Sequence, residues 1–93
     1  MKAIWNNIII AQSDKTIKIE GNHYFPPESV KKEYFQESNS TTRCIWKGKA
    51  NYFSVTISGE TNQDCAWFYP KPSFLAKKIT RHIAFWRGVQ ILD

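Results

Sequence analysis

Apolar and polar residues alternate along much of this chain, as they do in half-buried β-strands. In residues 52–57 the apolar side chains of Phe53, Val55 and Ile57 fall on one face, and Tyr52 begins the other. Similar alternation or short apolar runs predict strands over residues 2–5, 8–12, 16–20, 32–36, 65–69, 83–86 and 89–92. The pattern therefore predicts about eight short antiparallel strands.

Turn-forming residues separate these segments. Asn6 and Asn7 tolerate positive φ angles and predict a tight hairpin, and Gly48 marks a turn or bulge before the clearest strand. Residues 38–42 are small and polar, which predicts a loop, and residues 58–64 predict a polar connection between two strands.

The helical content is expected to be small. Pro27 suits the first turn of a helix, and Ser73 is a candidate N-cap for a short helix that ends near residue 78. With 93 residues, the chain has room for one core. We therefore expect a mainly β, compact single domain over residues 1–93, with one or two short helices. No apolar run approaches the roughly 20 residues that span a bilayer, and no signal peptide is recognisable, so we expect a cytoplasmic protein without membrane association.

The net charge of +5 lies mostly in the second half of the chain, because residues 44–93 hold seven Lys or Arg against three Asp or Glu. Such a balance favours anionic partners, among them nucleotides, phosphorylated metabolites and nucleic acid. A soluble surface with a basic bias explains the charge equally well. No signature of a nucleic-acid-binding module is present, so nucleic acid is a possible partner but not the favoured one.

The two cysteines, Cys44 and Cys65, do not form a CxxC pair. A zinc site that combined them with His23 and His82 would need four scattered ligands without a recognisable spacing. Disulfides are rare in cytosolic proteins. We expect no metal and no cofactor, and two small buried hydrophobic residues.

Aromatic side chains recur on one face of the predicted strand 65–69. Regular alternation places Cys65, Trp67 and Tyr69 together, with the intervening residues on the opposite face. Aromatic walls with a few polar groups suit flat rings such as nucleobases. Ordinary packing of core aromatics remains the alternative.

Lys47 and Cys44 add an ammonium and a thiol to the aromatic region. A nearby ammonium lowers the pKa of a thiol, but residues three apart in an extended segment tend toward opposite faces, so an inert Cys44 is the favoured interpretation. Lys47 precedes Gly48 and is a candidate to neutralise an anionic ligand, and Glu20 is a candidate hydrogen-bond acceptor. The residues expected to form a ligand pocket are Tyr24, Cys44, Trp46, Lys47, Trp67 and Tyr69.

Four sequence motifs carry a resemblance to a known family. They are EGNHYFP from Glu20, TRCIWKG from Thr42, ANYFSV from Ala50 and AWFYP from Ala66. Together they resemble the family catalogued as domain of unknown function 427, over nearly the whole chain. The resemblance implies a β-tent fold, related to methionine sulfoxide reductase B and to the ligand-binding domain of cereblon, and no established activity.

The family is also labelled nucleotidyltransferase-like, and the residues argue against that activity. Nucleotidyl transfer requires closely placed carboxylates that hold magnesium. The aspartates of this chain, Asp14, Asp64 and Asp93, stand in three separate places. The CxxC pairs that bind zinc in the related folds are also missing.

Three functional hypotheses follow from these observations. The first is a domain that binds a small flat or anionic ligand in the aromatic pocket. The second is an enzyme of unknown reaction that uses Cys44 or Glu20. The third is a module that binds nucleic acid or another protein. Nothing in the sequence favours a particular oligomeric state.

Overall fold

Nine β-strands and three short 3₁₀-helical segments make up the protein, in a computed structural model that describes residues 1–93. In chain order the strands are β1 (Lys2–Trp5), β2 (Ile8–Gln12), β3 (Ile17–Ile19), β4 (Asn22–Tyr24), β5 (Phe35–Cys44), β6 (Gly48–Ile57), β7 (Glu60–Phe68), β8 (Ile83–Phe85) and β9 (Gln90–Leu92). The helical segments are η1 (Pro27–Ser29), η2 (Lys32–Tyr34) and η3 (Phe74–Ile79). None of them has the length and apolar character needed to cross a bilayer. The prediction of a mainly β fold with little helix is confirmed.

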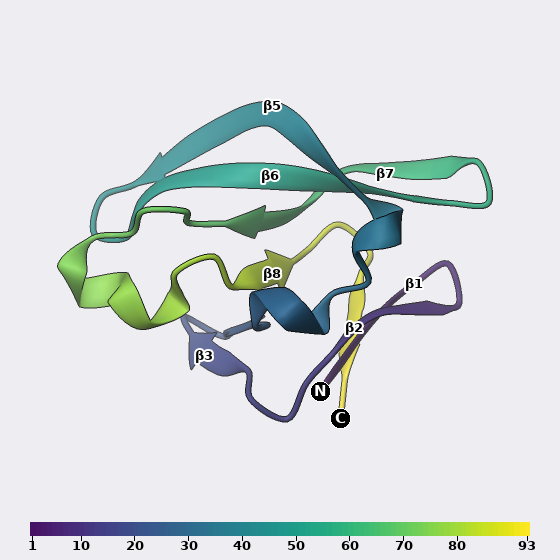
Figure 1. The fold of residues 1–93 in the computed structure, drawn as a ribbon, viewed down its shortest axis with the longest axis horizontal. Helices are drawn as coiled ribbons and strands as arrows, with labels where there is room; N and C mark the ends of the chain where they lie inside the picture. Colours follow the sequence, from purple (N-terminus) through teal and green to yellow (C-terminus); the bar gives the residue numbers. More distant parts are fainter.

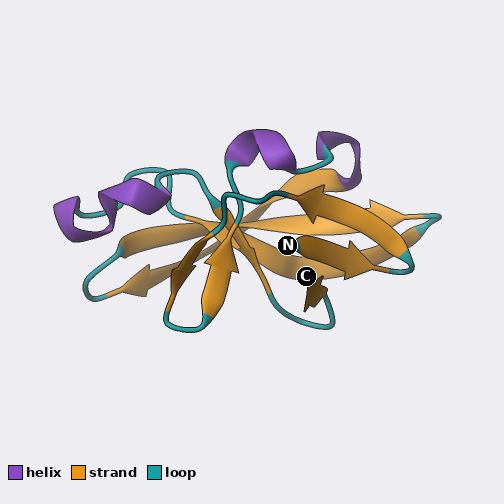
Figure 2. Ribbon diagram, turned by 90° about the horizontal axis from the view of Figure 1, so that it is seen from below, coloured by secondary structure: helices purple, strands orange, loops and turns teal.

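The strands form three antiparallel sheets, with the orders β2-β1-β9, β3-β4 and β5-β6-β7-β8. The long strands β5, β6 and β7 form a layer along the longest axis, with β1 and β2 near one end of it and β3 near the other (Figure 1). All helical segments lie along one side of the strands in the perpendicular view (Figure 2). The two ends of the chain are adjacent because β1 pairs with β9, with Lys2 opposite Leu92.

Two apolar clusters pack on opposite faces of the four-stranded sheet, because neighbouring residues of a strand point to opposite sides. The first contains Val55 and Phe68 together with residues of β1 and β2, and Phe53 packs against it. The second contains Tyr52, Tyr69 and residues of β4 and η3. The aromatic residues of the candidate pocket belong to the second cluster or pack against it.

Tight turns with two positive φ angles connect several hairpins. Asn6 and Asn7 have φ angles of 52° and 64° and join β1 to β2, as predicted from their tolerance of this conformation. Glu20 and Gly21 have φ angles of 55° and 82° and join β3 to β4. Glutamate rarely adopts this conformation, and here it stands at a corner of the candidate site.

The polar segments were predicted wrongly in two places. Residues 38–42 form the middle of β5 rather than a loop, and residues 60–64 belong to β7 rather than to a connection. Residues 41–42 and 60–62 pair with β6, which supplies backbone hydrogen bonds, and residues 38–40 and 63–64 lie in bulges beside them. Most of these polar side chains are exposed. Residues 32–36 are not an edge strand of their own, because η2 occupies the first part and β5 begins at Phe35.

Candidate functional site

The turn between β5 and β6 carries Lys47 into the second cluster. The backbone N–H of Ser73 donates a hydrogen bond to the carbonyl of Lys47 (2.9 Å), and the Ser73 hydroxyl donates to the carbonyl of Trp46. Gly48 follows with a φ angle of 114°, which lets the chain enter β6 directly after the turn. The turn is thus fixed to the segment that precedes η3, and only 4% of Lys47 remains exposed.

Lys47 and Glu20 form an ion pair across this region. The ammonium of Lys47 donates to one carboxylate oxygen of Glu20, and the indole N–H of Trp46 lies 3.3 Å from the other. The Lys47 ammonium also lies 4.9 Å from the centre of the Trp46 ring and 5.8 Å from that of Tyr69. Aromatic faces and a carboxylate therefore surround a cation that has lost most of its contact with water.

These contacts determine the protonation states of the side chains at the site. Burial is the largest single influence on the pKa of Lys47 and lowers it. The hydrogen bond to Glu20 and the nearby phenol and thiol groups together outweigh burial, so that the pKa lies above its ordinary value of 10.5. The hydrogen bond from Lys47 holds the pKa of Glu20 below its ordinary value of 4.5. Burial raises the pKa of Tyr69 to about 12. At neutral pH the site therefore contains an ammonium, a carboxylate and neutral phenols.

Trp67 connects three further aromatic side chains. Its indole N–H donates a 3.2 Å hydrogen bond to the hydroxyl of Tyr24, and the two rings meet edge to face at 6.3 Å. On its other side the Trp86 ring lies 5.7 Å away, also edge to face, and Trp86 in turn lies 6.4 Å from Tyr52. Edge-to-face contacts are a favourable geometry for pairs of aromatic rings, so these side chains hold one another in place.

These residues line an open cavity of about 150 Å³. A cavity of that size accommodates one six-membered ring. Its walls are mostly aromatic, and its polar groups come from β4 and from the β5–β6 turn. The lining residues are Asn22, Tyr24, Lys47, Tyr52, Trp67, Tyr69 and Trp86.

Four of the six residues expected to form a pocket line this cavity, namely Tyr24, Lys47, Trp67 and Tyr69. The other two, Cys44 and Trp46, do not line it but pack against the same cluster. Cys65 does not join Trp67 and Tyr69, contrary to prediction, and packs in the first cluster. The alternation breaks because Asp64, immediately before Cys65, has a φ angle of 54° inside a bulge of β7.

Asn22, Tyr52 and Trp86 were not among the expected pocket residues. Tyr52 lies on β6 directly opposite Trp67 of β7, and this pairing brings it to the cavity. Strand pairing of this kind cannot be read from a single sequence. Trp86 follows the last residue of β8, and its indole N–H donates to the carbonyl of Asp64 (2.6 Å). No sequence signal indicated this placement.

The surroundings of Cys44 lower the pKa of its thiol. Burial raises its pKa, but hydrogen bonds from the backbone N–H groups of Lys47 and Trp46, and the charge of Lys47, outweigh burial and lower the pKa below 9.0. Cys65 is completely buried, and burial raises its pKa to about 11. The two thiols are therefore chemically different.

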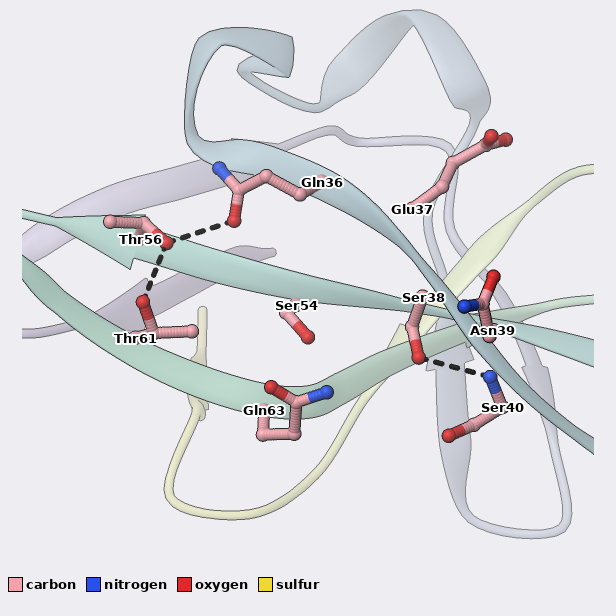
Figure 3. Close-up of a pocket in the computed structure, with 9 residues that line it drawn as sticks. All are labelled: Gln36, Glu37, Ser38, Asn39, Ser40, Ser54, Thr56, Thr61 and Gln63. Carbon is pink, nitrogen blue, oxygen red and sulfur yellow. Dashed lines mark hydrogen bonds between the residues drawn. The ribbon is translucent and has the colours of Figure 1, made fainter.

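A second, polar hollow of about 630 Å³ lies on the solvent side of β5, β6 and β7 (Figure 3). The hydroxyl of Thr56 is hydrogen bonded to Gln36 and Thr61, each at 2.8 Å. Most of its lining side chains are neutral, and several satisfy one another, as on the solvent face of an antiparallel sheet. We assign it no ligand.

The structure contains no group of three or more His, Cys, Asp or Glu side chains arranged to hold a metal ion. What the site offers is aromatic surface, an ammonium, a phenol hydroxyl and the Asn22 amide.

Fold and site together define a small antiparallel β domain with an aromatic cavity on one face of its main sheet. The family model described as Domain of unknown function (DUF427) matches residues 1–92, and the chain belongs to that family. No curated protein matches the chain. The resemblance inferred from the sequence motifs is thus confirmed.

Proposed function

We propose that the protein binds a small, flat, uncharged heterocycle that carries amide or imide groups. The observation that carries this proposal is the aromatic cavity of about 150 Å³ with a polar edge. Aromatic walls favour a flat ring, and the volume fits one ring rather than two.

The polar edge supports a ligand with carbonyl groups. Of the three N–H donors of Lys47, Glu20 takes one, so donors remain for a ligand carbonyl. The Tyr24 hydroxyl accepts from Trp67 and keeps its own proton to donate. The Asn22 amide can both donate to and accept from a ring amide.

The charge balance supports a neutral ligand over an anionic one. Lys47 was expected to neutralise a ligand anion, but Glu20 already compensates its charge. A ligand anion here would meet an ammonium and a carboxylate together, with little net attraction.

A matched pair of probes tests the proposal. Uracil and orotate share one ring, and orotate adds a carboxylate. Thermal unfolding and isothermal titration calorimetry would measure the binding of each compound. A ligand at about 100 times its Kd adds about 2.7 kcal/mol to the free energy of unfolding, which raises Tm by on the order of 10 °C. We expect uracil-like rings to bind more tightly than orotate.

Two variants locate the site. Trp67→Ala should abolish the uracil effect, whereas Trp5→Ala, on β1 and far from the cavity, should retain it. Failure of uracil, succinimide and nicotinamide to bind the folded protein would exclude the proposal, and tighter binding of orotate would show that the ligand is anionic.

A second candidate function is thiol chemistry at Cys44. The observation that favours it is the position of the thiol beside the backbone N–H groups of Lys47 and Trp46 and near the Lys47 charge. These contacts stabilise a thiolate, the reactive form of cysteine. Faster labelling of Cys44 than of free cysteine by a thiol reagent would support this candidate, and equal rates would exclude it.

A further inference from the structure

An apolar hollow of about 380 Å³ lies on the face of the main sheet opposite to the aromatic cavity. Phe53 and Phe68 line it, while their strand neighbours Tyr52 and Trp67 line the cavity on the other side. Because adjacent residues of a strand point to opposite faces, the sheet itself separates the two spaces. The two share no lining residue.

Three phenylalanines give this hollow flat apolar walls. The rings of Phe53 and Phe68 are stacked at 4.7 Å with 21° between their planes, and Phe35 meets Phe53 edge to face at 5.7 Å. Phe35 and Phe53 are half-buried. The volume lies in the range of small-molecule pockets, about 300–1,000 Å³, and is larger than packing faults normally leave.

Charged groups stand at the same hollow. Lys32 comes from η2 and Arg81 from the residues before β8, and the only ion pair of the protein, between Lys47 and Glu20, involves neither of them. Arg81 has a φ angle of 60°, and its backbone N–H donates to the carbonyl of Tyr69 (3.0 Å), which fixes the start of its side chain.

One carboxylate, that of Glu37, also lines the hollow, without an ion-pair contact to either cation. The three charged groups together carry a single net positive charge. A negatively charged ligand is therefore attracted, and Glu37 reduces the attraction of the two cations to about that of one charge. A guanidinium is well suited to a carboxylate because its N–H donors match both oxygens.

We propose that this hollow binds a small aromatic monocarboxylate, with its ring between the phenylalanines and its carboxylate at Lys32 and Arg81. Burial of the ring removes apolar surface from water on both partners. The two cations gain a hydrogen-bonded anion that the free protein does not provide. This site is independent of the one proposed for the aromatic cavity.

Titration with phenylacetate tests the proposal, because phenylacetamide has the same ring and nearly the same shape without the charge. Calorimetry and amide chemical-shift changes would follow binding to the full chain. We expect phenylacetate to bind at least about tenfold more tightly than phenylacetamide, since charge-assisted hydrogen bonds are worth that factor or more.

Three variants probe the individual features. Lys32→Gln and Arg81→Asn should each weaken phenylacetate binding about tenfold, and asparagine is chosen because it tolerates the positive φ angle at residue 81. Val30→Phe fills the hollow and should abolish binding regardless of charge. Lys18→Gln, on the exposed part of β3, is the matched control and should bind as the wild type does.

Specific results would overturn the proposal. Equal affinity for phenylacetate and phenylacetamide would remove the role of the cations. Unchanged binding in Val30→Phe would place the ligand elsewhere, and loss of binding in Trp67→Ala with retention in Arg81→Asn would move it to the aromatic cavity. Absence of saturable binding to the folded wild type would refute the site altogether.

Discussion

Lys47 and Glu20 lie 27 positions apart, on the turns of two different hairpins, yet their side chains form the protein's only ion pair. Glu20 stands in the turn between β3 and β4, and Lys47 in the turn between β5 and β6. The pair joins a two-stranded sheet to the main sheet beside the aromatic cavity. The stability of this connection should therefore depend on pH.

The first prediction concerns acid. A carboxylate whose folded-state pKa is lowered contributes stability that is present above its unfolded-state pKa and is lost as the pH falls through its folded-state pKa. The pKa of Glu20 is lowered by its hydrogen bond from Lys47. Between about pH 5 and pH 3 the wild type should thus lose more free energy of unfolding than Glu20→Gln.

Urea unfolding at a series of pH values measures this difference. Asp64, whose pKa is lowered by the hydroxyls of Ser38 and Ser40, titrates in both proteins, so subtraction isolates Glu20. Parallel pH profiles would contradict the prediction. Lys47 has the opposite dependence, because its pKa is raised on folding. Its contribution to the free energy of unfolding is therefore lost as the pH rises through the folded-state pKa.

The second prediction concerns the hydrogen bond between Trp67 and Tyr24. Tyr24→Phe removes the acceptor and leaves the indole N–H of Trp67 without its partner, which should cost about 1 kcal/mol of unfolding free energy. Chemical denaturation provides the measurement. Tyr34→Phe is the control, because the Tyr34 hydroxyl makes no hydrogen bond within the protein, and equal losses in both variants would refute the argument.

The third prediction concerns two bulges that face each other across β6. Between the pairs Glu37–Phe53 and Thr41–Asn51, β5 carries two more residues than β6, and β7 does the same around Asp64. The hydroxyl of Ser40 donates to the Asp64 carboxylate (2.7 Å), above the central strand. Asp64 also adopts a positive φ angle of 54°.

Asp64→Ala should therefore destabilise the protein by about 1–2 kcal/mol, through a strained backbone and a lost hydrogen bond. Asp64→Asn should cost less, because asparagine accepts the positive φ angle and keeps an acceptor for Ser40. Thermal or urea unfolding of the two variants measures this difference. A larger loss of stability in Asp64→Asn than in Asp64→Ala would contradict the prediction.

The fourth prediction separates the two cysteines. At neutral pH a thiol reagent should label Cys44 in the folded protein, faster than it labels free cysteine, while the fully buried Cys65 should remain unlabelled until unfolding. Lys47→Met should slow the labelling of Cys44, because it removes the nearby charge. Cys44→Ser is the control, and a Cys44 no more reactive than free cysteine would exclude a thiolate mechanism.

Local sequence patterns predicted much of the fold. The alternation in residues 52–57 and the paired asparagines at positions 6 and 7 carry their information in neighbouring residues, and the structure confirms both. Trp67 and Tyr69 were predicted to share one face of a strand, and both lie at the second cluster.

The remaining features depend on partners distant in the chain. Residues 38–42 look like a loop because serine and threonine favour turns, and they form a strand only because β6 supplies its hydrogen bonds. The ion pair of Lys47 requires two turns to meet, and Cys65 changes sides through the left-handed Asp64. No local pattern contains these relationships.

The ladder between β1 and β9 joins the two ends of the chain. The ladder has three residue pairs, and Gln90 and Leu92 of β9 are exposed. It closes the longest loop in the molecule, whereas each hairpin closes across a few residues, so its entropic cost is the highest. Fluctuations should therefore release β9 first and uncover the edge of β1, to which a strand of another molecule can pair. This route to strand pairing between molecules is then controlled by one short ladder rather than by the depth of the core.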